Sequence, residues 1–426
     1  MNLLVIGSGG REHSICYKLR QSKRINELFC IPGNAGTKKI AKNISLNISD
    51  FGKIYQTIKE NKIDIVIVGP EEPLVHGITD FLEKKSIKVL GPSKFASQLE
   101  GSKAFMKNLC KKNNIPTANF GIFEEFDKAA DFIERSKIPI VVKADGLAAG
   151  KGVLICNSKE DARIETKKIL NGKFKTSKKV VLEEFLEGEE LSYFVLVDKN
   201  SYSFFGSAQD HKKVGEGDTG LNTGGMGAYS PAKNLTRELE TKIKKKIIEP
   251  TLKAMKALKN PYTGFLYAGL MIKNDEPYLI EYNIRMGDPE CQVLMTRMMS
   301  DPLPALIASA DGVLDTFDLR WYDEVALTVV MASQGYPGDY GKGSQIKGID
   351  AAMASDETVM VFHAGTSLDP TGTLLATGGR VLNVTARGAT VKEAQARAYA
   401  AVAHIDWPEG FCRRDIGWRA VAREES

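Results

Sequence analysis

Short apolar runs alternate with polar, helix-like segments through the first hundred residues of this 426-residue chain. The apolar runs are NLLVIG (2–7), ELFCIPG (27–33), IDIVIVGP (63–70) and IKVLGP (87–92). Strands that alternate with helices predict β-α-β units and a parallel sheet with right-handed crossovers. Ligands of such sheets bind beyond the carboxyl ends of the strands. We therefore expect one binding rim, formed by the loops GSGGRE (7–12), PGNAGT (32–37), GPEEPL (69–74) and GPSKFA (91–96).

A second pattern, richer in strands, begins near residue 99. Strands are expected in IPIVVKADG (138–146), KKVVLEEFL (178–186) and SYFVLVD (192–198), and an antiparallel pair in GFLYAGLMI (264–272) and EPYLIEYNIR (276–285). Residues 207–231 are rich in glycine and show little apolar periodicity, which predicts a long loop that is functional or disordered. An apolar helical stripe follows, formed by Leu235, Leu239, Ile243 and Ile247. Pro250 should kink or end that helix.

The last hundred residues favour a small α+β domain. The runs EVALTVVMAS (324–333) and GGRVLNVTA (378–386) predict strands, with a Gly/Pro loop, QGYPGDYGKG (334–343), after the first of them. Thr390 and Glu393 match a capping box, so a helix should begin there.

Composition limits the classes of protein that the chain can belong to. Hydrophobic residues make up 43% and charged residues 26% of the chain, which is typical of a globular protein. No apolar run approaches the roughly 18 residues that cross a bilayer, and the start lacks the features of a signal peptide. We expect a cytoplasmic protein that binds neither a membrane nor nucleic acid. Six scattered cysteines without a CxxC pair and five dispersed histidines indicate reduced thiols, and neither a disulfide framework nor a multi-histidine metal site.

The net charge of +5 hides an uneven distribution. Residues 1–300 hold 47 Lys and Arg against 36 Asp and Glu, whereas residues 301–426 hold 11 against 17. The basic part is therefore the part expected to bind anions. Lysine falls from 39 residues before position 300 to 3 after it, which fits either a lysine-poor domain or a segment of separate origin.

The loop inside LLVIGSGGREH (3–13) bears on whether the sheet binds a dinucleotide. A dinucleotide fingerprint needs G-x-G-x-x-G and an acidic residue at the end of the second strand. Gly7 and Gly9 fit, but Glu12 stands at the third glycine position and the second strand ends in CIPGN, without a carboxylate. A nicotinamide-dependent oxidoreductase is thereby a weak alternative. Gly9, Gly10 and the helix behind them favour an anion such as a sugar phosphate, with a purely structural turn as the other explanation.

A second glycine loop, KADGLAAGKGV (143–153), has the chemistry of a phosphate-binding flap. Its glycines let backbone amides approach phosphate oxygens, and Lys143 and Lys151 add positive charge. A P-loop would need Ser or Thr after Lys151, where this chain has Gly152. Because the loop lies between two predicted strands, we expect a flap over a nucleotide; a flexible lysine-bearing hairpin is the alternative.

Two acidic strand ends complete the candidate chemistry. VLEEFLEGEELS (181–192) can offer backbone hydrogen bonds to a purine edge and a glutamate to ribose hydroxyls, although surface glutamates are usually solvated. In LIEYNIRMGDPE (279–290), Glu281, Asn283 and Arg285 alternate with apolar residues and should share one face of a strand. Two oxygen ligands beside a guanidinium suit a polyphosphate with bound Mg²⁺. A surface strand with an ion pair is the alternative.

With these segments in order, the chain resembles the ATP-grasp ligases and, within them, the glycinamide ribonucleotide synthetases of purine synthesis. The resemblance also rests on GSKAFMK (101–107), QDHKKVGEGDTGLNTGGMGAYSP (209–231), VFHAGT (361–366) and FCRRDIGWRA (411–420). It implies an α/β architecture with a Rossmann-like domain over 1–102, an ATP-grasp domain over 103–318 with a lid over 117–190, and an α+β domain over 319–426. It further implies ATP-dependent ligation of glycine to 5-phosphoribosylamine through glycyl phosphate, with Mg²⁺ or Mn²⁺ as cofactor. We expect a monomer or a dimer.

The resemblance also implies roles by position. ATP contacts are implied for Lys103, Lys143, Gly150, Lys151, Gly152, Glu183, Glu184, Phe185, Leu186 and Glu190. Metal ligation is implied for Glu281 and Asn283, and catalytic roles for Lys143, Asp210, His211, Lys212 and Arg285, the last of which would steady the acyl phosphate. Substrate contacts are implied for Gly9, Gly10, Glu72, Thr223, Gly224, Gly225, Met226, Arg285, Gly287, Asp288 and Arg380.

The chain departs from the family pattern at a few positions. Met286 stands where an aromatic residue is common and Cys291 where threonine is common, and both look like packing changes. The strand AGLMI (268–272) lacks the acid that many ATP-grasp enzymes carry, so the ligands of a second metal stay open. Two rivals remain: an ATP-grasp ligase for another carboxylate, and a nucleotide sensor without activity, which the presence of Lys143 and Glu281 disfavours.

Overall fold

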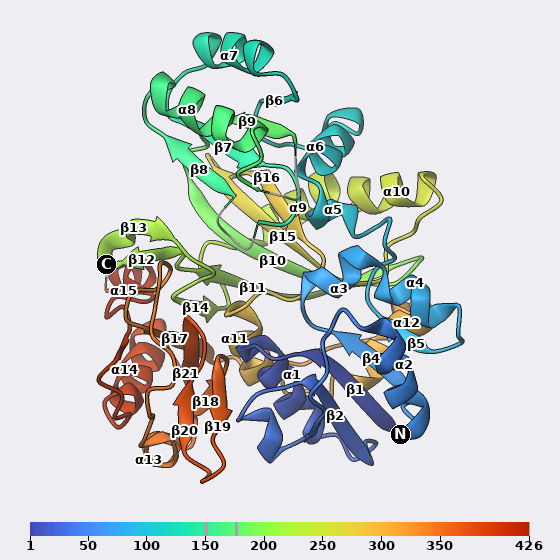
Figure 1. The fold of residues 1–426 in the computed structure, drawn as a ribbon, viewed down its shortest axis with the longest axis vertical. Helices are drawn as coiled ribbons and strands as arrows, with labels where there is room; N and C mark the ends of the chain where they lie inside the picture. Colours follow the sequence, from blue (N-terminus) through green and yellow to red (C-terminus); the bar gives the residue numbers. More distant parts are fainter. Residues whose placement is uncertain (149–151, 175–177, 426) are drawn as a thin grey trace.

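The computed structural model describes residues 1–148, 152–174 and 178–425 of the chain. Its N-terminal part is a parallel sheet in the order β3-β2-β1-β4-β5, drawn in blue in Figure 1. The strands are β1 (Asn2–Gly7), β2 (Glu27–Pro32), β3 (Lys42–Asn43), β4 (Ile65–Val68) and β5 (Lys88–Leu90). The helices are α1 (Gly10–Arg20), α2 (Phe51–Glu60), α3 (Glu71–His76) and α4 (Ile78–Glu83), with a 3-10 turn at Thr37–Lys39. The predicted β-α-β alternation is confirmed.

Strand β1 is the centre of this sheet and is buried on both faces. Leu4 and Ile6 share a core with residues of α2, whereas Leu3 and Val5 share another with residues of α1. An apolar run without alternation is typical of a parallel strand covered by helices on both sides. Because β1 pairs with both β2 and β4, the loop that follows it lies beside the loop of residues 69–70 at the carboxyl edge.

A four-stranded antiparallel sheet in the order β6-β9-β7-β8 lies at the top of Figure 1, within the lid predicted over residues 117–190. Its strands are β6 (Phe120–Phe123), β7 (Ile140–Ala144), β8 (Val153–Cys156) and β9 (Val180–Glu184), and its helices are α7 (Phe126–Arg135) and α8 (Lys159–Leu170). Helices α5 (Gln98–Gly101) and α6 (Lys103–Lys112) precede it. The predicted flap is the β7–β8 connection, within which Gly150 and Lys151 lie outside the described residues.

One nine-stranded sheet runs through the rest of the molecule, in the order β16-β15-β10-β11-β14-β17-β21-β18 with β22 paired to β17. Its strands are β10 (Glu189–Val197), β11 (Tyr202–Asp210), β14 (Gly227–Ser230), β15 (Gly264–Lys273), β16 (Glu276–Asn283), β17 (Val325–Ser333), β18 (Met360–His363), β21 (Arg380–Gly388) and β22 (Gly410–Phe411). The antiparallel pairing of β15 with β16 is confirmed. Because β14 pairs with β17, the C-terminal strands β17, β18, β21 and β22 extend the central sheet.

Residues 207–231 contain several strands, so the prediction of a long loop without regular structure is wrong. After β11 the chain forms a small antiparallel hairpin of β12 (Lys213–Gly215) and β13 (Thr219–Asn222), joined by a 3-10 turn (Glu216–Asp218), and then enters β14. The hairpin is half-buried or exposed along its length, so it needs no alternation of apolar and polar residues. Apolar periodicity therefore could not reveal it.

The helix predicted around residues 235–250 continues past its proline. It consists of α9 (Arg237–Ile243), a π-helical turn (Lys244–Ile248) and α10 (Glu249–Ala257). Pro250 has no N–H to donate, and the wider π turn directly before it lets the helix continue without that hydrogen bond. Leu239, Ile243 and Ile247 are buried as the stripe predicted.

The remaining elements cover the central sheet and its C-terminal extension. They are α11 (Glu290–Arg297), α12 (Leu303–Asp311), a 3-10 turn (Leu314–Thr316), α13 (Ile349–Ala354), β19 (Thr366–Leu368), β20 (Leu374–Ala376), α14 (Val391–Val402) and α15 (Trp418–Glu424). Thr390 Oγ1 accepts the Glu393 N–H at 3.1 Å, which confirms the predicted start of α14. Within the described ranges, no helix combines the length and the apolarity that a membrane crossing requires.

Candidate active site

A cavity of about 450 Å³ lies where the lid, the central sheet and the parallel sheet meet. The predicted site residues that line it are Lys103, Gly152, Asp210, Lys212, Thr223, Gly224, Glu281, Asn283, Arg285, Asp288 and Arg380. These residues come from distant parts of the sequence and from elements on every side of the cavity. The fold therefore brings these predicted phosphate, metal and substrate residues to one place, whereas other predicted residues lie outside it.

Glu281 and Asn283, the predicted metal ligands, lie at the end of β16 and face the cavity. Burial raises the pKa of a carboxyl group, but the ammonium groups of Lys212 and Lys143 hold that of Glu281 below its usual value. Among the described residues, neither ligand side chain has a hydrogen-bond or ion-pair partner. An ionised carboxylate and an amide oxygen suit Mg²⁺ or Mn²⁺. The described residues contain no cluster of three or more His, Cys, Asp or Glu for a metal, so phosphate oxygens and water would complete the coordination.

Lys143 and Glu183 form a buried ion cluster with Lys107 instead of lining the cavity. Lys107 Nζ donates to Glu183 Oε2 at 2.8 Å, and Lys143 Nζ lies 2.9 Å from Glu183 Oε1 as an ion pair without hydrogen-bond geometry. All three side chains are at most 5% exposed. Burial lowers the pKa of Lys107, and the Glu183 carboxylate opposes that shift. Both oxygens of Glu183 are thus engaged by lysines, which leaves neither free for adenine.

The other residues predicted around ATP are only partly brought to the cavity. Lys103 lines it and donates to the Gly146 carbonyl at 2.9 Å, and burial lowers its pKa. Glu184, Phe185 and Leu186 do not line the cavity. Phe185 and Leu186 are half-buried, and Glu184 is exposed. Glu190 also lies outside, but its carboxylate pairs with the lining residue Lys212 at 2.9 Å.

Arg285 is held in the cavity wall by two carboxylates from the N-terminal third of the chain. Its Nη2 donates to Glu100 Oε1 at 2.8 Å and its Nε to Glu71 Oε2 at 3.1 Å. Glu100 also accepts the Ile284 N–H at 2.8 Å, so it supports both the strand end and the guanidinium. Burial raises the pKa of Glu100 to about 7, although Arg285 acts to lower it. A charged group fixed in this way can stabilise developing charge without first reorganising.

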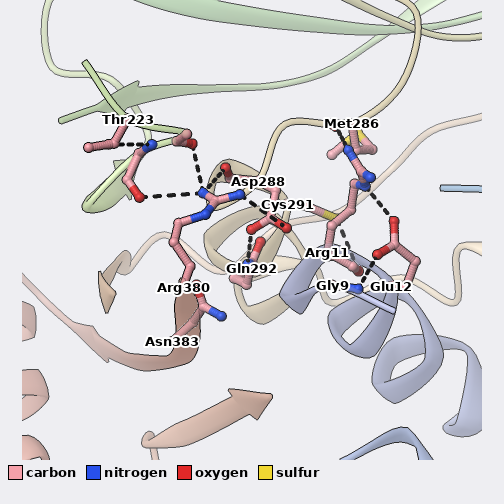
Figure 2. Close-up of polar contacts among 12 residues, drawn as sticks. Gly9, Arg11, Glu12, Thr223, Met286, Asp288, Cys291, Gln292, Arg380 and Asn383 are labelled. Carbon is pink, nitrogen blue, oxygen red and sulfur yellow. Dashed lines mark hydrogen bonds and ion pairs between the residues drawn. The ribbon is translucent and has the colours of Figure 1, made fainter. Parts of the chain in front are cut away.

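Arg380 also lines the cavity and joins three segments of the chain, as Figure 2 shows. Its Nη1 donates to the Gly224 carbonyl at 2.7 Å and to the Asp288 carbonyl at 2.5 Å, and its Nη2 lies 3.7 Å from the Asp288 carboxylate. Asp288 in turn accepts from Gln292 Nε2 at 2.7 Å. Burial raises the pKa of the Asp288 carboxyl, but Arg380, Arg11 and the hydrogen bond from Gln292 together hold it below its usual value.

The opening glycine loop is closed by Glu12, on the right of Figure 2. The Glu12 carboxylate accepts the Gly9 N–H at 2.6 Å and Arg11 Nε at 2.6 Å. A side chain at Gly69 would meet Glu12 Oε1 at 2.0 Å, so the carboxylate fills the space between this loop and the neighbouring one. The third glycine of a dinucleotide fingerprint is thus replaced by Glu12, whose carboxylate binds the loop itself.

A second cavity, of about 400 Å³, lies over this loop. Gly9 lines it, together with Ser8 and Asn47, and it shares Arg11, Pro70 and Asp288 with the first cavity. The structure changes the expectation of a free amide cradle, because the Gly9 N–H is already paired with Glu12. Gly10 lines neither cavity, since a side chain there would lie 2.4 Å from Asn383 Nδ2 and 2.5 Å from Gln292 Nε2.

Several predicted site residues lie outside both cavities. His211 is buried and does not line the cavity, although its neighbours Asp210 and Lys212 do. Neighbouring residues of an extended chain point to opposite sides, which accounts for the difference. Met226 belongs to the C-terminal core. Gly225 packs against Pro289, Gly287 against Glu290, and Glu72 accepts a hydrogen bond from Ser49 at 3.3 Å at the surface. For these five residues the contacts observed are structural.

Sequence reasoning missed some charged residues of the cavity: Arg11, Glu71, Glu100 and Glu290. Glu71 is adjacent to Glu72, and only the first of the pair reaches Arg285, since successive residues of a helix point about 100° apart. Arg11 stood in the opening loop, and Glu290 ended the motif GDPE. Glu100 carried no signal, because its partner Arg285 is far away in the sequence.

The fold and the site together define an ATP-grasp ligase. Solved biotin carboxylases from Hydrogenobacter thermophilus and Campylobacter jejuni share this fold, with TM-scores of 0.73 and 0.72 at 18% and 15% identity over 96% of this chain and 91% and 92% of theirs. Models of phosphoribosylglycinamide synthetase match residues 1–100 as the N domain, 101–291 as the ATP-grasp (A) domain and 326–419 as the C domain. The chain belongs to the phosphoribosylglycinamide synthetase family.

Full-length relatives support this assignment. The phosphoribosylamine–glycine ligases of Mesorhizobium japonicum and of an Escherichia coli strain are 53% and 46% identical over the whole of both chains. A crystal structure of phosphoribosylamine–glycine ligase from Thermotoga maritima superposes with a TM-score of 0.85 at 34% identity, covering 98% of this chain and 100% of that one.

Proposed function

We propose that this protein joins glycine to 5-phosphoribosylamine and cleaves ATP to ADP and phosphate in the process, giving glycinamide ribonucleotide for purine synthesis. One observation carries the proposal. The cavity that holds the free acidic and amide ligands shares Arg11, Pro70 and Asp288 with a second cavity over the opening glycine loop. Two neighbouring cavities suit a reaction that must hold a nucleotide and a sugar phosphate at the same time. The relatives that match over their full length carry the name of this activity.

The chemistry needs charge neutralisation more than covalent help. A divalent cation, Mg²⁺ or Mn²⁺, bound by Glu281 and Asn283 would neutralise the ATP phosphates. A glycine carboxylate oxygen attacks the γ-phosphorus while the bond to ADP breaks, which gives glycyl phosphate. Lys103 and Lys212 line the cavity and offer positive charge to the phosphates. Arg285, fixed by Glu71 and Glu100, is placed to steady the acyl phosphate.

The second half of the reaction moves a proton. The amine of phosphoribosylamine attacks the acyl carbon, the C–O bond to phosphate breaks, and the amine gives up a proton. Burial and the neighbouring Glu290 raise the pKa of Asp210, which lines the cavity and has a buried oxygen without a hydrogen-bond partner. A carboxylate with a raised pKa is a better proton acceptor, so we assign this role to Asp210.

The remaining assignments follow the division of the chain. We propose a substrate domain over residues 1–102, an ATP-grasp domain over 103–318 with a lid over 117–190, and a C-terminal domain over 319–426. The sugar phosphate is assigned to the second cavity, beside Gly9 and the amide of Asn47. Closure of the lid over ATP would bring Phe185 and Leu186 to the nucleotide. We propose that the enzyme works in the cytoplasm as a monomer or a dimer.

Phosphate release tests the function. With ATP and Mg²⁺, we expect rapid release of phosphate only when glycine and phosphoribosylamine are both present, with one glycinamide ribonucleotide formed per phosphate. Release with a different amino acid in place of glycine would instead support an ATP-grasp ligase for another carboxylate. A folded protein that releases no phosphate with both substrates would contradict the proposal.

A further inference from the structure

The C-terminal motif FCRRDIGWRA (411–420) makes contacts that the proposed chemistry does not use. Its central side chain, Arg413, is only 1% exposed. The guanidinium donates to both oxygens of Asp415 at 2.8 Å, to Asp218 Oδ1 at 3.0 Å and to the Lys213 carbonyl at 3.0 Å. A forked guanidinium bound to two carboxylates and a carbonyl fixes both the distance and the orientation of its partners. Arg413 therefore ties the motif to the β12–β13 hairpin, residues 213–222.

Further contacts hold the outer turn of the same hairpin. The Gly217 N–H donates to Asp415 Oδ2 at 2.8 Å, and the Arg414 N–H donates to Glu216 Oε1 at 3.1 Å. Arg419 Nη2 lies 2.8 Å from Asp218 Oδ2. Each residue of the turn is thus bound by the C-terminal motif. The hairpin has little hydrophobic burial of its own, so these contacts supply most of its anchoring.

His211, which directly follows β11, belongs to the same anchor. Its Nε2 accepts the Gly417 N–H at 3.0 Å, which requires the neutral tautomer protonated at Nδ1. Burial, together with the charge of Arg413, lowers the pKa of His211 to about 4, so the ring stays neutral at physiological pH. The histidine is thereby a structural acceptor for the C-terminal motif, and it does not line the cavity.

The base of the hairpin lies in the cavity. Lys212 and Thr223, which flank the hairpin on either side, both line the cavity. They are joined because the Lys212 carbonyl accepts the Thr223 N–H at 2.7 Å and its Oγ1–H at 2.8 Å. A displacement at the anchored turn would therefore be transmitted to the ammonium group of Lys212 and to the strand that carries Thr223.

We propose that Arg413 is a positioning residue that locks the hairpin of residues 213–222 and so holds Lys212 and Thr223 in the cavity. The expected effect of Arg413 on kcat/KM rests on the proposed function, whereas its anchoring of the hairpin does not. Arg397 offers a matched control. It lies in the same C-terminal region and pairs with Glu393 at 2.6 Å and Asp356 at 3.5 Å, but it does not contact the hairpin.

The test compares Arg413→Gln with Arg397→Gln in the full-length protein. For Arg413→Gln we expect faster amide hydrogen exchange in residues 213–222 and a roughly ten- to hundredfold lower kcat/KM for ligation, since a displacement of about 1 Å costs about that much. Arg397→Gln should change neither quantity. Arg413→Lys keeps the positive charge but loses the forked guanidinium. Its hydrogen exchange and kcat/KM should therefore lie between those of the wild type and of Arg413→Gln.

Each outcome of this test counts for or against the proposal. Unchanged exchange in the hairpin of Arg413→Gln would show that Arg413 does not anchor it. Faster exchange with normal kcat/KM would show that the hairpin does not position the site. If Arg413→Gln does not fold, Asp218→Asn removes the hairpin's own half of the anchor and should give the same pair of changes. A wild-type protein without ligase activity would contradict the proposed function, while hydrogen exchange would still decide whether Arg413 anchors the hairpin.

Discussion

The two ends of the active-site cavity are built in different ways. At one end, Lys103, Glu281 and Asn283 come from the part of the chain that matches the ATP-grasp domain, and the buried cluster around Glu183 lies within the same part. At the other end, Arg380 of the C-terminal strands binds the segment of Asp288, which lies beside the glycine loop of the parallel sheet (Figure 2). One end is assembled within a single domain, and the other exists only where three domains meet.

The two ends should therefore depend on different interactions. The end with the proposed metal ligands depends on charges balanced inside one domain, so its failure should reduce the stability or the chemistry of that domain. The junction depends on hydrogen bonds between domains, so its failure should first weaken the binding of the sugar phosphate. Four substitutions or conditions can test this separation.

The largest effect is expected for the buried cluster of the ATP-grasp domain. Glu183→Gln leaves Lys107 and Lys143 buried without a counter-charge, which should lower the free energy of unfolding by about 3–5 kcal/mol. Urea unfolding measures the change. Glu184→Gln is the control, because that neighbouring side chain is exposed and should change stability by less than about 0.5 kcal/mol. Equal effects of the two substitutions would contradict a role for Glu183 in charge balance.

The next effect concerns catalysis at the same end. Glu281→Ala removes the only carboxylate assigned to the metal and should lower kcat by about 10²–10³-fold with the fold intact. Steady-state phosphate release at saturating ATP and Mg²⁺ measures it. Glu276→Ala, at the other end of β16, removes surface pairs with Lys242 and Lys246 and should leave kcat unchanged. Near-normal turnover of Glu281→Ala would remove that residue from the metal site.

The junction should weaken in mild acid. His13 of α1 and His363 of β18 lie in contact, the His363 N–H donating to His13 Nδ1 at 2.8 Å. Burial lowers the pKa of His13 to about 3 and that of His363 to about 4, whereas the unfolded value is 6.5. The stability that these neutral rings provide is complete above pH 6.5 and falls as the pH falls toward 4, because the unfolded chain binds the extra protons.

The size of this pH effect can be measured by unfolding at pH 7 and pH 5. Each histidine should contribute a loss of about 2 kcal/mol by pH 5. His363→Gln should reduce the difference between the two pH values by about 2 kcal/mol, and His404→Gln, at an exposed position, should not reduce it. A stability that is the same at both pH values would contradict the buried, neutral state of the pair.

The smallest effect is expected at the cavity wall of the junction. Arg380→Ala removes the donor to Gly224 and Asp288 and should raise the KM for phosphoribosylamine about tenfold, with little change in the KM for ATP. Arg387→Ala, on the same strand, removes a pair with Glu324 far from the cavity and serves as the control. An equal rise in the KM for ATP would show that the two ends are not separable.

The sequence predicted the elements and site residues that depend on local patterns, and it missed those that depend on contacts between distant segments. The strands β1, β4, β15 and β16 were predicted because their apolar patterns are local, and Glu281 and Asn283 because they alternate on one strand. The hairpin of residues 213–222 was missed because long-range contacts with Arg413 hold it, not an apolar face. Glu71 and Glu100, the partners of Arg285, were missed because they are distant in the sequence. His211 was predicted together with Asp210 and Lys212, but only those two neighbours line the cavity, because side chains alternate along an extended chain.

Ligation through an acyl phosphate is the claim that joins both ends of the cavity, and an oxygen label tests it directly. The enzyme is given ATP, Mg²⁺, phosphoribosylamine and glycine that carries ¹⁸O in its carboxylate, and the released phosphate is examined by mass spectrometry. Because a carboxylate oxygen attacks the γ-phosphorus and leaves with it, each phosphate should carry one glycine oxygen. Phosphate released without the label, in step with formation of glycinamide ribonucleotide, would contradict the mechanism.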